Sequence, residues 1–446
     1  MSILKIKIGL EIHVTINTQS KLFCSCSTKQ SSPNTQVCPV CLGHPGSKPV
    51  TNKEAVKKII LIAKALNCEL REELIFSRKS YFYPDLSKNY QITQFEEPIG
   101  ENGFFESKGK IRIKRVHLEE DPASITRTNK TLIDYNRSGT PLAEIVTEPD
   151  ITSSLQARAF MKKLLRDLQY LEVFNGEDVI KADVNVSVEK SGFKRVEVKN
   201  VTGFKDIQSV IEHEVRRQQK EEVVENETRG WDAAKRKTYS MRKKETEADY
   251  AYIYEPDIPI IDVSKFLGVK LPKLSDERIK DFIEKGVDPV DADIICMRKD
   301  VADFFEKTTS EPKITSYWVR RELLRVLEDN AVEETFLDAK EFSKLIELVE
   351  KKTLNENIAK EILELMRDKK IDVKKYVEKN NLKTLNDDNL IEETVKRVLK
   401  ENQKAVEDYK SGEEKALQYL VGQDMKLTKG KAHPKKTNEM ILERIE

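Results

Sequence analysis

Two segments of the sequence pair carboxylates with histidines in a way that suits a cation-binding site. In residues 6–16, IKIGLEIHVTI, apolar side chains fall at every second position. This period predicts a β-strand with one buried face, so that Glu11 and His13 project together from the other face. Such a pair can share one ion or phosphate. The alternative is an ordinary solvated strand face, because charged residues normally lie outside.

The second such segment is IRIKRVHLEE, residues 111–120, which also alternates. The apolar phase slips by one residue, and this slip predicts a β-bulge near Lys114. Beyond the slip, His117 and Glu119 project together, and Glu120 follows at once. A second group of acidic residues with a histidine is therefore expected on a strand face.

Two further predicted strands carry polar side chains on one face. Glu144 and Glu148 stand four residues apart in PLAEIVTE, and Asp183 and Asn185 alternate with apolar residues in ADVNVSV. Antiparallel strands with one face packed on helices give this pattern. A sheet face lined with carboxylates can bind divalent cations, and Mg²⁺ usually brings nucleotide phosphates with it. The sequence lacks a G-x-x-x-x-G-K-[ST] motif, so an ATP site here is not a P-loop.

Four cysteines form two close pairs, FCSC and VCPVC, separated by a short polar loop: Cys24, Cys26, Cys38 and Cys41. Paired thiolates at this spacing predict a tetrahedral zinc site, although the first pair is C-x-C rather than C-x-x-C. Four thiolates close the coordination sphere, so the zinc is expected to be structural. The alternative is that these cysteines bind no metal.

Basic residues cluster with aromatic residues or glycine in two places. Residues 76–100 interleave Lys79 and other basic residues with tyrosines, which suits contact with phosphate and stacking on a base. The alternative is an aromatic hairpin that packs on a core. Near the end, VGQDMKLTKGKAHPKK gathers lysines around one glycine, a composition suited to an RNA backbone. The alternative there is a solvated chain end.

The composition bounds the class of protein. The chain has 446 residues, of which 35% are charged, and a net charge of +1. This length predicts two or three domains. The N-terminus enters a strand without a signal peptide, and no apolar run approaches membrane-spanning length. These features predict a soluble, cytoplasmic protein. After about residue 290 strand alternation gives way to helical patterns.

A series of segments, taken in order, resembles the motifs of the B-subunit family of tRNA-dependent amidotransferases. They are IGLEIHV, PNTQVCPVCLGHPG, YFYPDLSKNYQITQ, HLEED, DYNRSGTPLAEIVTEPD, ADVNVSV, ETRGWD and YIYEPDIP. The end of the chain resembles that family's YqeY-type tail, so the resemblance covers essentially the whole sequence. The related archaeal E subunit carries a large inserted domain, which this chain is too short to hold.

The resemblance implies an α+β fold. Residues 1–293 are expected to form a cradle domain of the glutamine synthetase/guanido kinase type, with an antiparallel sheet and a zinc knuckle at residues 24–41. A helical domain over residues 294–372 and a YqeY-like, tRNA-binding helical tail over residues 373–446 are expected to follow.

The resemblance also implies a reaction. Members of this family use ATP and Mg²⁺ to phosphorylate the side-chain carboxylate of misacylated Glu-tRNA(Gln) or Asp-tRNA(Asn), and ammonia then displaces the phosphate. The ammonia comes through a tunnel from an amidase-fold partner, the A subunit, and a small C subunit holds the two together. This chain has no amidase-type Ser-Ser-Lys set, so it is not expected to make its own ammonia.

Carried onto this sequence, the resemblance implies roles for particular residues. The catalytic and magnesium-binding candidates are Glu11, His13, one or both of Glu119 and Glu120, and Glu148. Asp183 and Asn185 are expected to complete the site or position ATP, with Arg137 and Lys79 on phosphates. The tail residues expected to hold tRNA are Lys426, Lys429, Lys431 and Lys435. One departure from the family is Pro122-Ala123-Ser124 in place of an AGK-like segment, which removes a lysine.

Two other classes of function remain open from the sequence. One is a non-catalytic, tRNA-binding zinc protein, against which the acidic strand faces count because RNA-binding faces are seldom acidic. The other is an independent ATP-dependent ligase that uses free ammonia. The long helical tail counts against that class, since a small substrate does not need it.

Overall fold

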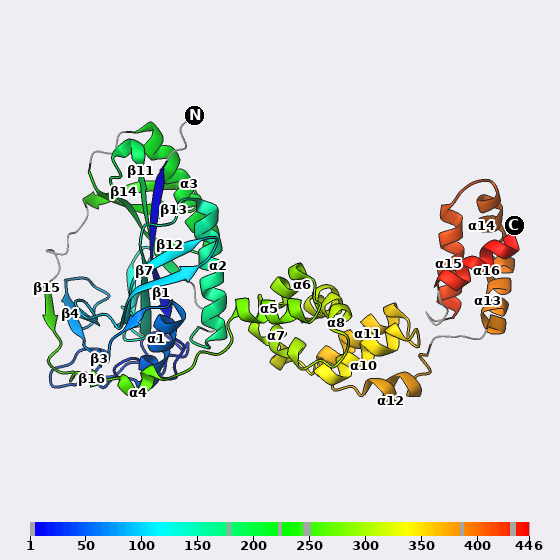
Figure 1. Ribbon diagram of the computed structural model, residues 1–446, viewed down its shortest axis with the longest axis horizontal. Helices are drawn as coiled ribbons and strands as arrows, with labels where there is room; N and C mark the ends of the chain where they lie inside the picture. The colour runs from blue at the N-terminus through cyan, green and yellow to red at the C-terminus, as the bar shows by residue number, and fades with distance from the viewer. Residues whose placement is uncertain are drawn as a thin grey trace. The chain divides into compact units, whose positions relative to one another are not determined.

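The computed structural model describes residues 5–174, 176, 180–221, 225–243, 251–383, 388–428 and 434–445. The chain divides between Leu274 and Ser275 into two compact units. The first unit contains the β-sheets and the second is helical (Figure 1), which confirms the predicted α+β class. The likeness to glutamine synthetase and the functional partition into three domains stay predictions. The expected boundary after residue 293 falls within helix α6 (Pro289–Ile295).

A nine-stranded sheet organises the first unit, with the strand order β14-β13-β12-β11-β1-β10-β7-β6-β2. Its neighbouring strands are antiparallel except for β12 and β13. In chain order the strands are β1 (Ile6–Thr15), β2 (Glu69–Leu70), β6 (Gly100–Glu106), β7 (Lys110–Glu120), β10 (Pro141–Thr147), β11 (Lys181–Val188), β12 (Val196–Thr202), β13 (Glu227–Asp232) and β14 (Lys237–Lys243). The first strand is therefore central, between β10 and β11.

Smaller sheets surround the large one. Strands β15 (Ala251–Tyr254), β4 (Ser77–Ser80) and β5 (Tyr90–Thr93) form a three-stranded sheet. Two ribbons pair β16 (Ile261–Asp262) with β3 (Glu73–Leu74), and β8 (Ser124–Arg127) with β9 (Thr131–Asp134). The helices of this unit are α1 (Lys53–Ala65), α2 (Ser154–Tyr170), α3 (Phe204–Lys220) and α4 (Ser264–Leu267), with a 3₁₀ turn at Glu189–Ser191.

The helices cover one face of the large sheet. Helices α2 and α3 run side by side along it (Figure 1), and α1 packs on β7. The apolar residues of β1 join this core: Ile8, Leu10 and Ile12 are each at most 1% exposed. The predicted alternation of β1 is thus confirmed. Successive strand residues point to opposite faces, so Glu11 and His13 of β1 point away from the helices. That second face of the sheet is where a site can form.

The second unit consists of helices. They are α5 (Ser275–Glu284), α6, α7 (Lys299–Glu306), α8 (Pro312–Trp318), α9 (Leu324–Leu327), α10 (Ala339–Glu350), α11 (Glu356–Asp368), α12 (Val373–Lys379), α13 (Asp388–Glu401), α14 (Gln403–Lys410), α15 (Lys415–Leu427) and α16 (Pro434–Ile445), with a π-helical turn at Val319–Leu323 and a 3₁₀ turn at Val332–Glu334. Helices α13, α15 and α16 share a core of their own, built on Val395, Leu420 and Ile441. In the described ranges, none of the helices has the length and apolar run that a bilayer span requires.

Candidate active site and metal centre

Three neighbouring strands bring two histidines and a glutamate to one level of the sheet. His13 of β1 lies opposite Glu144 of β10, and Glu144 lies opposite His117 of β7. Residues directly opposite each other in an antiparallel pair share one face. The Nε2 atoms of His13 and His117 lie 3.4 and 3.2 Å from Oε2 of Glu144. Glu144 therefore stands between two imidazoles.

Two more carboxylates complete the group. Nε2 of His13 lies 4.0 Å from Oε1 of Glu11 and 4.0 Å from Oε1 of Glu119, and Nε2 of His117 lies 3.7 Å from Oε2 of Glu119. The result is two triads, Glu11–His13–Glu144 and His117–Glu119–Glu144, in each of which the possible ligand atoms lie within 4.8 Å of one another. We call these five residues the carboxylate–histidine cluster. Glu144 belongs to both triads.

The cluster has the unsatisfied polar atoms that a bound cation would engage. His117 is 4% exposed, and neither of its ring nitrogens meets the geometry of a hydrogen bond with the described residues. The same holds for Oε1 of Glu144, although Nη2 of Arg115 lies 3.5 Å from it as an ion-pair partner. Buried polar groups are normally hydrogen-bonded, so these weakly engaged atoms leave room for a bound ligand. The carboxylates of the cluster suit a hard divalent cation such as Mg²⁺ or Mn²⁺, whereas its imidazoles are ligands more typical of transition metals.

The crowding of charge in the cluster shifts pKa values. The charge of Glu144, followed by burial, raises the pKa of Glu11 to about 7. Burial alone would lower the pKa of His13, but its hydrogen bond to Glu144 and the charges of Glu144, Glu119 and Glu11 outweigh burial and raise it to about 10. The protonated imidazole thus offsets part of the negative charge. A bound cation would offset it in the same place.

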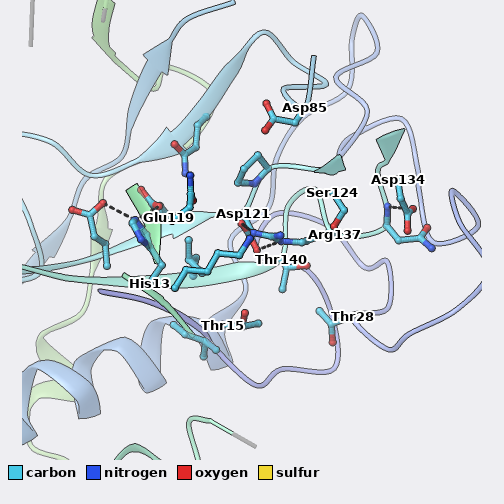
Figure 2. Close-up of a pocket in the computed structure, with 18 of the residues that line it drawn as sticks. His13, Thr15, Thr28, Asp85, Glu119, Asp121, Ser124, Asp134, Arg137 and Thr140 are labelled. Atoms are coloured by element: carbon cyan, nitrogen blue, oxygen red, sulfur yellow. Dashed lines mark hydrogen bonds and ion pairs between the residues drawn. The ribbon is translucent and has the colours of Figure 1, made fainter. Parts of the chain in front are cut away.

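A cavity of about 1450 Å³ opens over the cluster, and Glu11, His13, Glu119 and Glu144 line it. Its other walls carry basic side chains: Lys79, Arg137, Lys181 and Lys199. In Figure 2 the Arg137 side chain points toward Asp121, and Nη2 of Arg137 donates to Oδ1 of Asp121 at 2.6 Å. The lining of the cavity thus combines carboxylates that suit cations with basic side chains that suit anions, and outside the cluster it also includes Asp85, Asp121, Asp134 and Asp183.

The basic residues of the cavity lining differ in their ion-pair partners and in how their surroundings shift their pKa values. Lys199 pairs with Asp183 at 2.8 Å, so Asp183 lines the cavity as an ion-pair partner. Burial, followed by the charge of Arg137, lowers the pKa of Lys181. Burial alone would lower the pKa of Lys79, but Tyr252 and the cluster glutamates outweigh burial and raise it.

The structure does not bring Glu148 or Asn185 into the cluster. Both lie near the level of Gly9 rather than that of His13: Asn185 pairs directly with Gly9, and Glu148 follows the end of β10. Four strand residues at about 3.3 Å each place Glu148 roughly 13 Å along the strand from Glu144. The sequence pattern placed Glu148 with the cluster because it showed a shared face but not the level along the strand.

Glu120 also lies apart from the cluster. Consecutive strand residues point to opposite faces, so Glu120 turns away from the side that Glu119 faces. Its carboxylate pairs with Lys88 at 2.6 Å and accepts from the backbone N–H of Ile92 at 2.8 Å. Glu120 therefore links the end of β7 to β5 and to Lys88, which precedes β5.

Two cluster members, His117 and Glu144, are missing from the site residues that the resemblance implied. The alternation of β7 did signal His117, because it shares a face with Glu119. The bulge predicted near Lys114 is present, since the register passes from Arg115 to Ile113 as the partner strand advances by one residue. Glu144 joins the cluster because β10 pairs with β1 and β7 in this register. The register depends on residues far apart in the sequence, so a local pattern does not reveal it.

The cysteine pairs come together as predicted. The sulfur atoms of Cys24, Cys26, Cys38 and Cys41 lie within 4.8 Å of one another. The backbone N–H of Cys38 donates to Sγ of Cys41 at 3.2 Å. A hydrogen bond from the Cys24 thiol, together with the charge of Lys21, lowers the pKa of Cys41 to about 4. Four converging sulfurs fit a closed tetrahedral zinc site.

The lysines of the tail are only partly described. Lys426 on α15 and Lys435 on α16 are exposed. Lys429 and Lys431 lie outside the described residues. Helices α15 and α16 pack against each other and so carry Lys426 and Lys435 on one small body.

Two family models match the chain. The model of the GatB/GatE catalytic domain matches residues 6–267, and that of the GatB domain matches residues 303–445. The chain belongs to the GatB family. The match to the catalytic domain includes every strand that carries the carboxylate–histidine cluster.

Curated relatives within the GatB family match along nearly their full length. One from Thermotoga maritima is 43% identical over 474 residues, covering 98% of each chain. One from Thermosipho melanesiensis is 42% identical over 464 residues, covering 97% of each. One from Thermodesulfovibrio yellowstonii is 42% identical over 465 residues, covering 97% of this chain and 98% of its own. Each of these proteins is named as the B subunit of an aspartyl/glutamyl-tRNA(Asn/Gln) amidotransferase.

Proposed function

We propose that this chain is the B subunit of an aspartyl/glutamyl-tRNA(Asn/Gln) amidotransferase. In this proposal it phosphorylates the side-chain carboxylate of a misacylated Glu-tRNA(Gln) or Asp-tRNA(Asn), using ATP and Mg²⁺, and then amidates it with ammonia. The observation that carries the proposal is the pair of triads that share Glu144 beside a cavity that basic side chains also line.

The chemistry explains why both charge types are needed. A carboxylate is a poor acyl donor, because its oxygen is a poor leaving group. Attack of a carboxylate oxygen on the γ-phosphorus of ATP forms an acyl phosphate and releases ADP. Ammonia then attacks the acyl carbon, and inorganic phosphate leaves. The first step brings two anions together, so it depends on charge stabilisation more than on a protein nucleophile.

The cluster residues would hold the divalent cations. Glu11, His13 and Glu144 form one candidate site, and His117, Glu119 and the same Glu144 form the other. Bound Mg²⁺ neutralises phosphate oxygens and so lowers the barrier to attack by the carboxylate. The chain's own part is to fix these ligands on adjacent rigid strands.

The basic walls would receive the anionic parts of the substrates. Lys79 and Lys181 line the cavity together with Arg137, whose guanidinium Asp121 orients. The guanidinium of Arg137 carries a permanent positive charge that suits a phosphate oxygen. We assign Arg137 and Lys79 to phosphate binding. Lys181 is a third basic residue of the lining.

The other parts of the proposal concern the zinc site, the source of the ammonia, the contacts with tRNA and the location of the protein. The four cysteines would hold a structural zinc ion, because their sulfurs converge without an open position for substrate. The ammonia would come from an amidase-fold partner, the A subunit, and the heterotrimer would also include a small C subunit. Lys426 and Lys435 would contact tRNA, with Lys429 and Lys431 of the same segment. A cytoplasmic location is part of the proposal.

Release of ADP from Mg-ATP tests the proposed function. The chain is assayed with its partner subunits and with Glu-tRNA(Gln), with Asp-tRNA(Asn), and with each tRNA uncharged. Release that requires a charged tRNA is the expected result, and it also identifies the substrate. Intact tRNA binding without such release would instead indicate a non-catalytic tRNA-binding protein.

A further inference from the structure

A buried lysine connects the cysteine site to the wall of the cavity. Lys21 is 1% exposed, and its Nζ lies 3.6 Å from Sγ of Cys41. The same ammonium donates to the backbone carbonyl of Tyr135 at 3.2 Å. A buried ammonium is costly unless an opposite charge compensates it. The sulfur of Cys41, as a zinc-bound thiolate, would supply that charge.

The segment of residues 135–140, which we call the Arg137 loop, receives the other contact of Lys21. The loop carries Arg137, whose side chain lines the cavity. The backbone N–H of Leu22 donates to the carbonyl of Gly139 at 2.8 Å, next to the Lys21 contact. Gly139 has a φ of +88°, and a Cβ there would lie 3.5 Å from Cδ of Lys21 and 3.6 Å from Cβ of Cys41. Lys21 thus lies between the Arg137 loop and Cys41 and contacts both.

The Arg137 loop is also tied to the strand that bears the cluster. The backbone N–H of Gly139 donates to the carbonyl of Asp121 at 2.9 Å, and the N–H of Asp121 donates to the carbonyl of Thr140 at 2.8 Å. A continuous series of contacts therefore links Cys41, through Lys21 and the backbone of the Arg137 loop, to Asp121. Asp121 in turn orients the Arg137 guanidinium.

We infer that Lys21 is a positioning residue that stabilises the negatively charged cysteine–metal site and transmits its occupancy to the Arg137 loop. The inference rests on the metal centre proposed above. A zinc ion with four thiolates carries a net charge of −2, and the Lys21 ammonium offsets half of it. Without the metal, the four sulfur atoms are no longer held at fixed positions, so the Cys41 sulfur no longer fixes the Lys21 ammonium. The Tyr135 carbonyl then loses a firmly placed donor.

The first test measures metal affinity in full-length Lys21→Met. This change keeps most of the aliphatic stem and removes the ammonium. Loss of a group that hydrogen-bonds to a metal ligand typically weakens affinity by roughly 10- to 100-fold, and we expect a loss in that range for Zn²⁺ in competition with a chromophoric chelator. The matched control is Lys88→Met, which removes a buried ammonium that pairs with Glu120 instead of sulfur. Lys88 also lies against Gly43, close to the cysteine site.

The second measurement is spectroscopic and does not respond to a general loss of stability. In the Co²⁺-substituted chain, a nearby positive charge lowers the energy of the sulfur lone pairs. Lys21→Met is therefore expected to move the thiolate-to-cobalt charge-transfer band to longer wavelength, and Lys88→Met to leave it in place. Unchanged affinity and an unchanged band in Lys21→Met would overturn the inference.

A third measurement needs no variant, so it decides the matter even if Lys21→Met does not fold. Hydrogen–deuterium exchange is compared in the zinc-loaded and chelator-stripped full chain. Faster exchange of the amides of Ser138, Gly139 and Thr140 after stripping, with β11 unchanged, is the expected result. Unchanged exchange in the Arg137 loop would overturn the inference alone. A chain that binds no Zn²⁺ at all would overturn the metal centre itself.

Discussion

Replacement of Glu144 by Gln removes the residue that both triads share. The change is nearly isosteric, but it takes one charged ligand from each candidate cation site at once. It also removes the largest cause of the raised pKa of Glu11, so the carboxylate of Glu11 returns toward its ordinary acidity. Burial alone would raise the pKa of Glu144, but His117 and His13 outweigh burial and hold it well below its usual range, so the change also costs stability. Glutamine keeps the size of the side chain, and we expect the fold to survive with a lower melting temperature.

The expected effect on the reaction is large. Removing one preorganised group that stabilises transition-state charge typically costs roughly 100- to 1000-fold in rate, and Glu144→Gln acts on two such sites. We expect ADP release dependent on charged tRNA to fall by at least the lower figure at a temperature well below the melting point of the variant, with tRNA affinity little changed. The Mg²⁺ concentration needed for half-maximal ADP release is also expected to rise.

Glu148→Gln is the matched control, because it makes the same substitution four residues further along. Glu148 lies beyond the end of β10, and its backbone N–H donates to the carbonyl of Arg112 at 2.9 Å. Its side chain is not among those that line the cavity. Near-normal ADP release is expected. Normal activity in Glu144→Gln with severe loss in Glu148→Gln would refute the assignment made from the structure.

Three further predictions concern the cysteine site, a buried ion pair and the tail. Cys26→Ser is expected to lower the zinc content measured by mass spectrometry and the melting temperature together; a wild-type chain without zinc would contradict this. Burial alone raises the pKa of Glu214, but hydrogen bonds from Arg217 and Thr238 outweigh it and hold the pKa below 4.5. Its ionised form therefore stabilises the fold above about pH 4.5, and this contribution is lost as pH falls through the folded-state pKa. Glu214→Gln should cost about 3 kcal/mol in urea unfolding at pH 7, and less in acid; an equal cost at both pH values would refute it. Lys426→Gln should weaken tRNA binding and reduce its salt slope by about 1, whereas an unchanged slope would exclude a phosphate contact.

The local parts of the site could be predicted from the sequence. The period of β1 placed Glu11 and His13 on one face, and the spacing of the cysteines predicted their convergence. The bulge near Lys114 also followed from a slip in the apolar pattern. Each of these features depends on residues close together in the chain, where periodicity and spacing carry the information.

The non-local parts could not be predicted in this way. Whether Glu144 or Glu148 joins His13 depends on the register between β1 and β10, and that register is set by pairing between strands far apart in sequence. Lys21 gave no signal either, because a lysine before an apolar pair is typical of a surface. Its burial follows from packing against the Arg137 loop, more than a hundred residues later.

The central claim is that the substrate carboxylate is phosphorylated. The most direct test uses glutamyl- or aspartyl-tRNA whose side-chain carboxylate is labelled with ¹⁸O, with Mg-ATP and the complete complex. Attack by that carboxylate on the γ-phosphorus leaves one of its oxygens bridging carbon and phosphorus, and this oxygen departs with the phosphate. We predict one ¹⁸O atom in each inorganic phosphate released. Formation of the amide with unlabelled phosphate would contradict the account.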